Sequence, residues 1–82
     1  MTAKDMFKEL NFKWKETEDV IEYTRSLFKH FSFFQKEKIT FHKDSYNCYF
    51  YLDGVNTMNI YLLQAINQQV YELGWENVNI TD

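Results

Sequence analysis

The chain of 82 residues has no proline, two glycines and one cysteine. Disordered and low-complexity segments are rich in proline and glycine and poor in aromatic residues, so this composition excludes them. The single cysteine, Cys48, excludes an internal disulfide and fits a reducing compartment. Neither Gly54 nor Gly74 belongs to a glycine-rich loop, which excludes a phosphate cradle of that kind.

Long hydrophobic runs are also absent. No apolar stretch approaches the roughly 18 to 20 residues that a membrane span needs. The first ten residues include Lys4, Asp5, Lys8 and Glu9, where a secretory signal would be apolar. We therefore expect a protein of the cytoplasm that has no membrane partner.

Aromatic residues are unusually frequent: the chain has eight Phe, six Tyr and two Trp, and 45% of its residues are apolar. This content is enough for a hydrophobic core, and the length leaves room for one small domain covering residues 1–82.

Charge is unevenly distributed along the chain, whose net charge is −3. Residues 1–43 hold all nine basic residues and seven acidic ones, whereas residues 44–82 hold five acidic residues and no basic one. The lysines of the first half alternate with acidic residues, so no dense basic patch is visible. The net charge also disfavours nucleic acid as a partner.

A short amphipathic helix is predicted over residues 3–10. Thr2 and Asp5 resemble a capping box at its start, with the hydroxyl placed for a backbone N–H group of the first turn.

A second helix is predicted over residues 58–73, with Thr57 as its N-cap and Gly74 as the left-handed residue that follows its end. Its apolar stripe is expected to lie on the sheet. The stripe consists of Leu62, Leu63, Ile66, Val70 and Leu73.

Alternating apolar and polar residues predict a sheet of four or five strands between the helices. The strands cover about residues 12–16, 20–25, 28–35, 39–43 and 46–52. Turns are expected at Lys36-Glu37 and Asp44-Ser45, and residues 76–82 form a tail that adds a strand or frays. Because every link is short, the strands form an antiparallel meander, and two helices on one face make an α+β, two-layer domain.

A two-residue turn at Asp44-Ser45 pairs Phe41 with Cys48 and Ile39 with Phe50. The side of the sheet that faces the helices then holds Ile39, Phe41, Tyr46, Cys48, Phe50 and Leu52. His42 lies on the opposite side from Cys48, so the two cannot act as base and nucleophile or share a metal ion. We expect no enzymatic activity, no catalytic residue, no metal site and no cofactor.

Aromatic residues on two outer faces are the candidate interaction residues. On the sheet these are Tyr49 and Tyr51, joined by Phe31 and Phe33 if Lys36-Glu37 forms a turn. If the register slips by one residue, Phe31 and Phe33 belong to the core instead.

The outer face of the second helix is also aromatic, with Tyr61, Tyr71 and Trp75. Between Thr57 and Trp75 the only charged residue is Glu72, so this face suits a partner better than water. Trp75 has an alternative position, folded back on Val70 as part of the C-terminal cap.

Both ends of the chain resemble a known group of proteins. Residues 1–12 (MTAKDMFKELNF) and residues 63–75 (LQAINQQVYELGW) are similar to small phage- and prophage-encoded proteins of Gram-positive bacteria. The resemblance implies an accessory protein of phage type in the cytoplasm of a bacterial host. It implies no catalytic residue, since the group has no assigned activity.

These features lead to two functional hypotheses. The first is a non-enzymatic protein-protein interaction module that binds itself, as a homodimer, or a host or phage protein. The alternative is a nucleic-acid binder in which the aromatic sheet face stacks with bases. Its basic neighbours would be Lys29, Lys38 and Lys43.

Overall fold

The computed structural model describes residues 1–29, 33–52 and 59–75, and for residues 27–29, 33–36 and 52 it describes the backbone. It contains two helices and four strands in the order α-β-β-β-β-α. The elements are α1 (Ala3–Glu9), β1 (Lys13–Glu16), β2 (Val20–Lys29), β3 (Phe33–His42), β4 (Asn47–Leu52) and α2 (Ile60–Glu72). The predicted tail, residues 76–82, lies outside the described residues.

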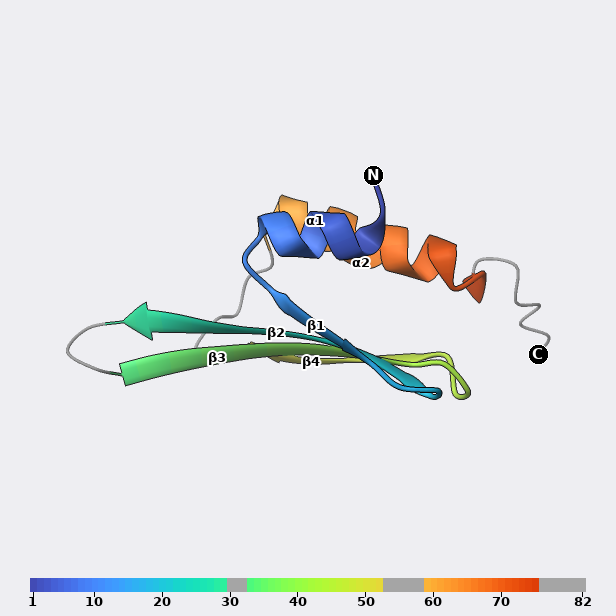
Figure 1. Ribbon diagram of the computed structural model, residues 1–82, viewed down its shortest axis with the longest axis horizontal. Coiled ribbons are helices and arrows are strands. Elements are labelled where there is room, and N and C mark those ends of the chain that lie inside the picture. Colours follow the sequence, from blue (N-terminus) through green and yellow to red (C-terminus); the bar gives the residue numbers. More distant parts are fainter. Residues whose placement is uncertain (30–32, 53–58, 76–82) are drawn as a thin grey trace.

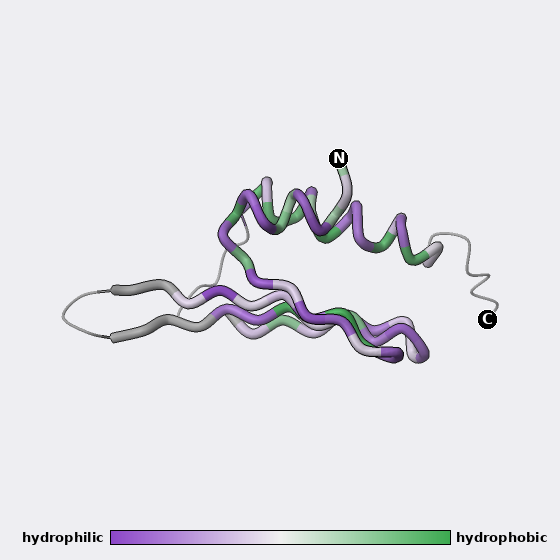
Figure 2. Tube along the Cα trace, in the orientation of Figure 1, coloured by the Kyte–Doolittle hydropathy of each residue, from purple (hydrophilic) through white to green (hydrophobic). Residues whose placement is uncertain are grey.

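The four strands form one antiparallel meander with the spatial order β1-β2-β3-β4. Figure 1 shows both helices on one face of this sheet, which leaves the other face without a helical layer. The predicted α+β architecture is therefore confirmed. Hydrophobic positions recur along both helices and in the part of the sheet beneath them (Figure 2).

The strand boundaries between residues 20 and 43 differ from the prediction. Instead of three strands, the chain forms β2 and β3, each ten residues long. Lys36 and Glu37 lie inside β3, so the predicted turn at these residues is wrong. The charge of Glu37 is explained by Arg25, its partner on β2, whose Nε donates to Glu37 Oε2 at 3.2 Å. Two adjacent charged residues in the sequence therefore indicated a turn, although Glu37 lies inside a strand and is neutralised by Arg25 of the neighbouring strand.

The predicted register between the last two strands is confirmed: Phe41 pairs with Cys48, and Ile39 pairs with Phe50. The turn itself is longer than Asp44-Ser45 and covers residues 43–46. Tyr46 adopts a left-handed conformation there, with φ of 55°. Because the predicted and the observed turn are both centred between Asp44 and Ser45, the pairing beyond them is the same.

The helix ends are set by side-chain and backbone caps. Thr2 caps α1 by accepting from the Asp5 N–H, as predicted. α2 begins two residues later than expected, because Asn59 and not Thr57 is its N-cap, accepting from the Tyr61 N–H at 2.8 Å. Gly74 has φ of 74° and follows the end of α2, which confirms its predicted role.

Aromatic rings make up the centre of the core. Phe7 of α1 stacks on Tyr23 of β2 with 3.8 Å between ring centroids, and Phe41 of β3 meets both rings edge-on. Around them pack Ala3, Phe12, Ile21, Ile39, Leu62, Ala65 and Ile66. The core therefore joins α1 and α2 to β2 and β3, and Cys48 of β4 packs against it.

The face of α2 that is buried differs in part from the predicted stripe. Leu62 and Ile66 are buried as expected, but Leu63 is exposed and Gln69 is buried in its place. Gln69 accepts a hydrogen bond of 2.6 Å from the Tyr23 hydroxyl. Burial, and next the carboxylates Glu72 and Glu16, raise the pKa of Tyr23 well above its ordinary value. The hydrogen bond between Tyr23 and Gln69 thus favours the orientation of α2 about its own axis in which Gln69, and not Leu63, faces the sheet.

Candidate interaction surface

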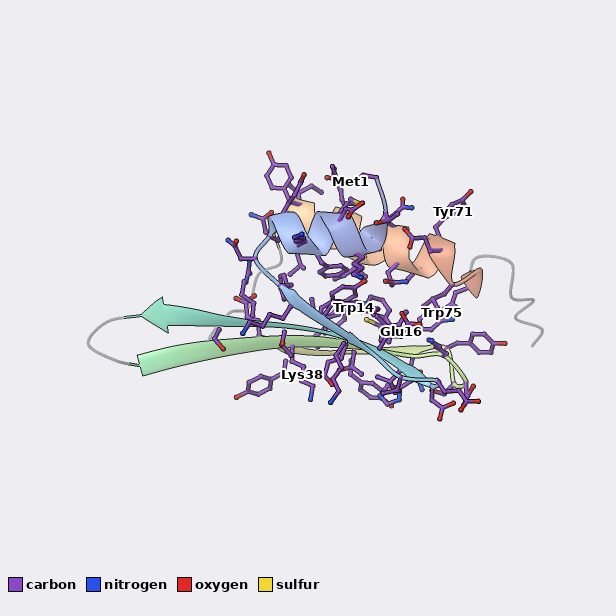
Figure 3. The ribbon with its side chains drawn as sticks, viewed as in Figure 1. Met1, Trp14, Glu16, Lys38, Tyr71 and Trp75 are labelled. Atoms are coloured by element: carbon purple, nitrogen blue, oxygen red, sulfur yellow. The ribbon has the colours of Figure 1, made fainter. Side chains whose placement is uncertain are left out.

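The uncovered face of the sheet carries two of the predicted interaction residues. Tyr49 and Tyr51 of β4 point to this face, and both side chains are more than half exposed. Lys38 lies directly across from Tyr51 on β3 and points away from the helices (Figure 3). Its ammonium group lies 3.5 Å from Glu22, so this lysine is paired with a carboxylate.

Phe31 and Phe33 were expected to join this face through a turn at Lys36-Glu37. That turn does not exist, so the argument for their position fails. Phe33 is the first residue of β3 and pairs with Lys29. Phe31 and the side chain of Phe33 lie outside the described part of the structure.

Phe50 adds an exposed ring on the other side of the same strand, although the register predicted it to be covered by the helices. It was assigned to the covered side with Ile39, its cross-strand partner, yet half of its side chain is exposed. The reason is that β4 is the last strand of the sheet and lies beyond the cover of the helices. The meander order already implied this edge position. Tyr46 is exposed for a similar reason, since it lies in the turn.

The outer face of α2 presents Tyr61 and Tyr71, both of which are exposed as predicted. Figure 3 shows Tyr71 pointing away from the sheet, while Trp75 lies between α2 and the sheet. Trp75 is half-buried, with its ring centroid 6.0 Å from that of Phe41 and 6.0 Å from that of Tyr46. Trp75 therefore belongs to the edge of the core and not to the exposed face of α2.

Cys48 and His42 lie on opposite sides of the sheet, as the predicted register requires. Cys48 packs against the core, whereas His42 contacts the Tyr49 ring on the uncovered face, with centroids 4.9 Å apart. Burial raises the pKa of the Cys48 thiol from 9.0 to about 11. A thiol with such a pKa is a poor nucleophile at neutral pH because little of it is thiolate.

This pKa predicts the reactivity of Cys48 toward a thiol reagent at pH 8. A rise from 9.0 to about 11 reduces the thiolate fraction about 100-fold, while the higher pKa makes the remaining thiolate roughly tenfold more nucleophilic, so the folded protein should react at least about tenfold more slowly than the same protein in denaturant. The absorbance of released thionitrobenzoate measures both rates. Equal rates in the folded and unfolded protein would contradict the burial of Cys48.

Within residues 1–29, 33–52 and 59–75, no three His, Cys, Asp or Glu side chains gather closely enough to hold a metal ion. Among the helices in these ranges, none has the length and apolar character required to cross a bilayer.

No family model matches the chain, and neither the curated proteins nor the solved structures contain a significant match to it.

Proposed function

We propose that the protein is a small, non-enzymatic interaction module that associates with a second copy of itself through β4. The main support for this proposal is a run of three exposed aromatic rings on this edge strand. Tyr49, Phe50 and Tyr51 are 56%, 50% and 58% exposed, and they alternate between the two faces of the sheet. Apolar area of this kind is disfavoured in water and favours burial against a partner.

The backbone of β4 supports the same proposal. β4 pairs with β3 on one side, and no described strand pairs with its other side. That side presents a row of N–H and C=O groups, which an added strand can pair with. Residues Asn47–Leu52 contain no charge and no proline, which are two of the features that natural proteins use to block an exposed edge.

A second copy is the occupant that fits this edge. Two β4 strands related by a two-fold axis pair antiparallel, and each then brings the same rings to the contact. Because β4 is uncharged, its pairing with an identical strand opposes no like charges within the strand. The resulting dimer contains one continuous eight-stranded sheet, in which the rings of both copies shield each other from water.

The alternative, nucleic acid on the uncovered face, has less support. Phe31 and Phe33 have lost the turn that placed them beside Tyr49 and Tyr51, and Lys38 is paired with Glu22. A role as a phage accessory protein in a bacterial cytoplasm remains a prediction from the resemblance of the two chain ends, and it is compatible with a self-associating module.

The test is the mass of the protein in solution, with and without a charge on β4. Wild-type protein at high concentration should have twice the 10.1 kDa mass of the chain. Tyr51→Glu should shift the mass to that of one chain, because each copy would bring a desolvated carboxylate to the contact. Light scattering coupled to size exclusion measures both masses, and circular dichroism shows whether the fold is kept.

Tyr71→Glu is the matched control, since Tyr71 is equally exposed but lies on α2. This variant should remain dimeric. Dissociation by both substitutions, or by the α2 substitution alone, would contradict pairing through β4. A monomeric wild type that binds single-stranded oligonucleotides, and loses this binding with Tyr51→Glu, would establish the alternative function.

A further inference from the structure

A pocket of about 470 Å³ opens beside the junction of α1 and β1, at the edge of the sheet opposite β4. We call it the Lys-Trp pocket, and its lining residues are Lys4, Lys8, Phe12, Lys13 and Trp14. Its volume lies in the range of small-molecule sites, roughly 300 to 1,000 Å³. Three of the five lining side chains are cationic, and none is acidic.

The cations of this pocket have no carboxylate partner among the described residues. Ion pairs in the described part of the chain occupy other lysines, namely Lys38 and Lys43. Lys4, Lys8 and Lys13 take part in none of them. Lys4 and Lys8 are also one helical turn apart, a spacing at which like charges destabilise a helix unless an anion lies between them.

The acidic residues of α1 point elsewhere. Asp5 and Glu9 each follow a pocket lysine by one residue, which places them about 100° further around the helix. Glu9 instead lines a separate groove of about 330 Å³ on the side of α1 that faces α2. The charge inside the Lys-Trp pocket is therefore positive although the chain as a whole carries −3.

Two rings give the pocket an apolar surface beside these charges. Phe12 is buried and is covered by the Arg25 guanidinium at 4.4 Å. Trp14 is 43% exposed, and the Lys4 ammonium lies 3.7 Å from the centre of its indole. The Lys4 ammonium lies over one face of the indole, so a planar group can stack on this face only when the Lys4 side chain moves aside, where its ammonium can meet a negative charge on the same ligand.

We infer that the Lys-Trp pocket binds a nucleotide. The base stacks on Trp14, and the phosphate lies among the ammonium groups of Lys4, Lys8 and Lys13. A free mononucleotide and the phosphorylated end of a single strand offer the same chemistry. The site is on α1 and β1, so it is separate from the self-association surface on β4 and does not depend on it.

Titrations with four probes test this assignment: thymidine 5′-monophosphate, thymidine, inorganic phosphate, and a 5′-phosphorylated oligothymidylate of about eight nucleotides. Calorimetry measures each affinity, and quenching of tryptophan fluorescence reports stacking. The mononucleotide should bind at least about tenfold more tightly than thymidine or phosphate alone, since only it engages both the ring and the cations. If the oligonucleotide binds about tenfold more tightly than the mononucleotide, the site is assigned to the ends of single strands. If the two bind with equal affinity, the site is assigned to free nucleotides.

Matched charge reversals locate the site. Lys8→Glu should raise the Kd of the mononucleotide at least about tenfold, whereas Lys15→Glu should change it less than about twofold. Lys15 is an exposed lysine of β1 that does not line the pocket, and both variants should keep the circular dichroism of the wild type. Trp14→Leu should abolish the preference for the mononucleotide over phosphate. The inference is overturned by equal effects of the two lysine variants, by phosphate binding as tightly as the nucleotide, or by no binding in calorimetry.

Discussion

Phe7→Ala should lower the free energy of unfolding by about 3 to 5 kcal/mol, which is most of the stability expected of a small domain. Phe7 is fully buried and stacks on Tyr23, with further ring contacts to Phe12 and Phe41. The alanine leaves a cavity between α1 and the sheet, and the two layers cannot close it without separating Tyr23 from Gln69. Urea denaturation followed by circular dichroism measures the loss.

Phe50→Ala provides the control for this prediction. The same atoms are removed, but Phe50 is half-exposed on β4 and lies outside the central cluster. Its replacement should cost less than about 1 kcal/mol at concentrations where the chain is monomeric. Equal losses for the two variants would mean that the core is not centred on Phe7.

Glu37→Gln should lower the free energy of unfolding by about 3 kcal/mol, because it leaves the charge of Arg25 without its partner. Glu37 is 5% exposed and accepts from both Nε and Nη2 of Arg25. The Arg25 Nη1 donates at 2.7 Å to the Leu10 carbonyl at the end of α1, so the ion pair also positions this helix. Thermal and urea denaturation both report the change.

Glu22→Gln makes the same substitution in a surface pair and serves as the matched control. The partner of Glu22 is Lys38, whose side chain is 43% exposed, so the loss should stay below about 1 kcal/mol. The double variant Arg25→Met, Glu37→Leu should recover much of the stability lost in Glu37→Gln, since it removes the buried charge of Glu37 and the partly buried charge of Arg25 together. If the double variant is less stable than Glu37→Gln, the Arg25–Glu37 pair stabilises the fold by more than the neutralisation of its two charges.

The parts of the fold that could be predicted are those determined by nearby residues. Thr2 and Asp5 meet within one helical turn, and the pairing of Phe41 with Cys48 follows from the short turn between their strands. Gly74 adopts the conformation that the end of α2 requires. The two-layer α+β architecture follows in turn, because short links and two amphipathic helices leave few other arrangements.

The errors arise where distant residues decide the outcome. Lys36-Glu37 was assigned to a turn because the side chain that neutralises Glu37 belongs to another strand. Gln69 was not predicted among the buried residues of α2, because its partner, Tyr23, lies 46 residues earlier in the chain.

The exposure of Phe50 also depends on a distant feature, namely how far the helices extend over the sheet. The candidate surface was thus predictable at Tyr49 and Tyr51, whose orientation follows from the local register. At Phe50 and Trp75 the local register was not sufficient: it placed Phe50 on the covered side and left two positions open for Trp75, because packing between the layers places these rings.

The two edges of the sheet are unlike, and this difference limits the size of any assembly. β1 ends the sheet with a strand of four residues that bears Lys13 and Lys15, whereas β4 ends it with six residues and no charge. If both edges were bare, copies would add head to tail without limit and form a ribbon. With a single bare edge, one β4-to-β4 contact uses the open edge of each copy, and both ends of the joined sheet then carry lysines. In the proposed assembly, growth is therefore expected to stop at two chains.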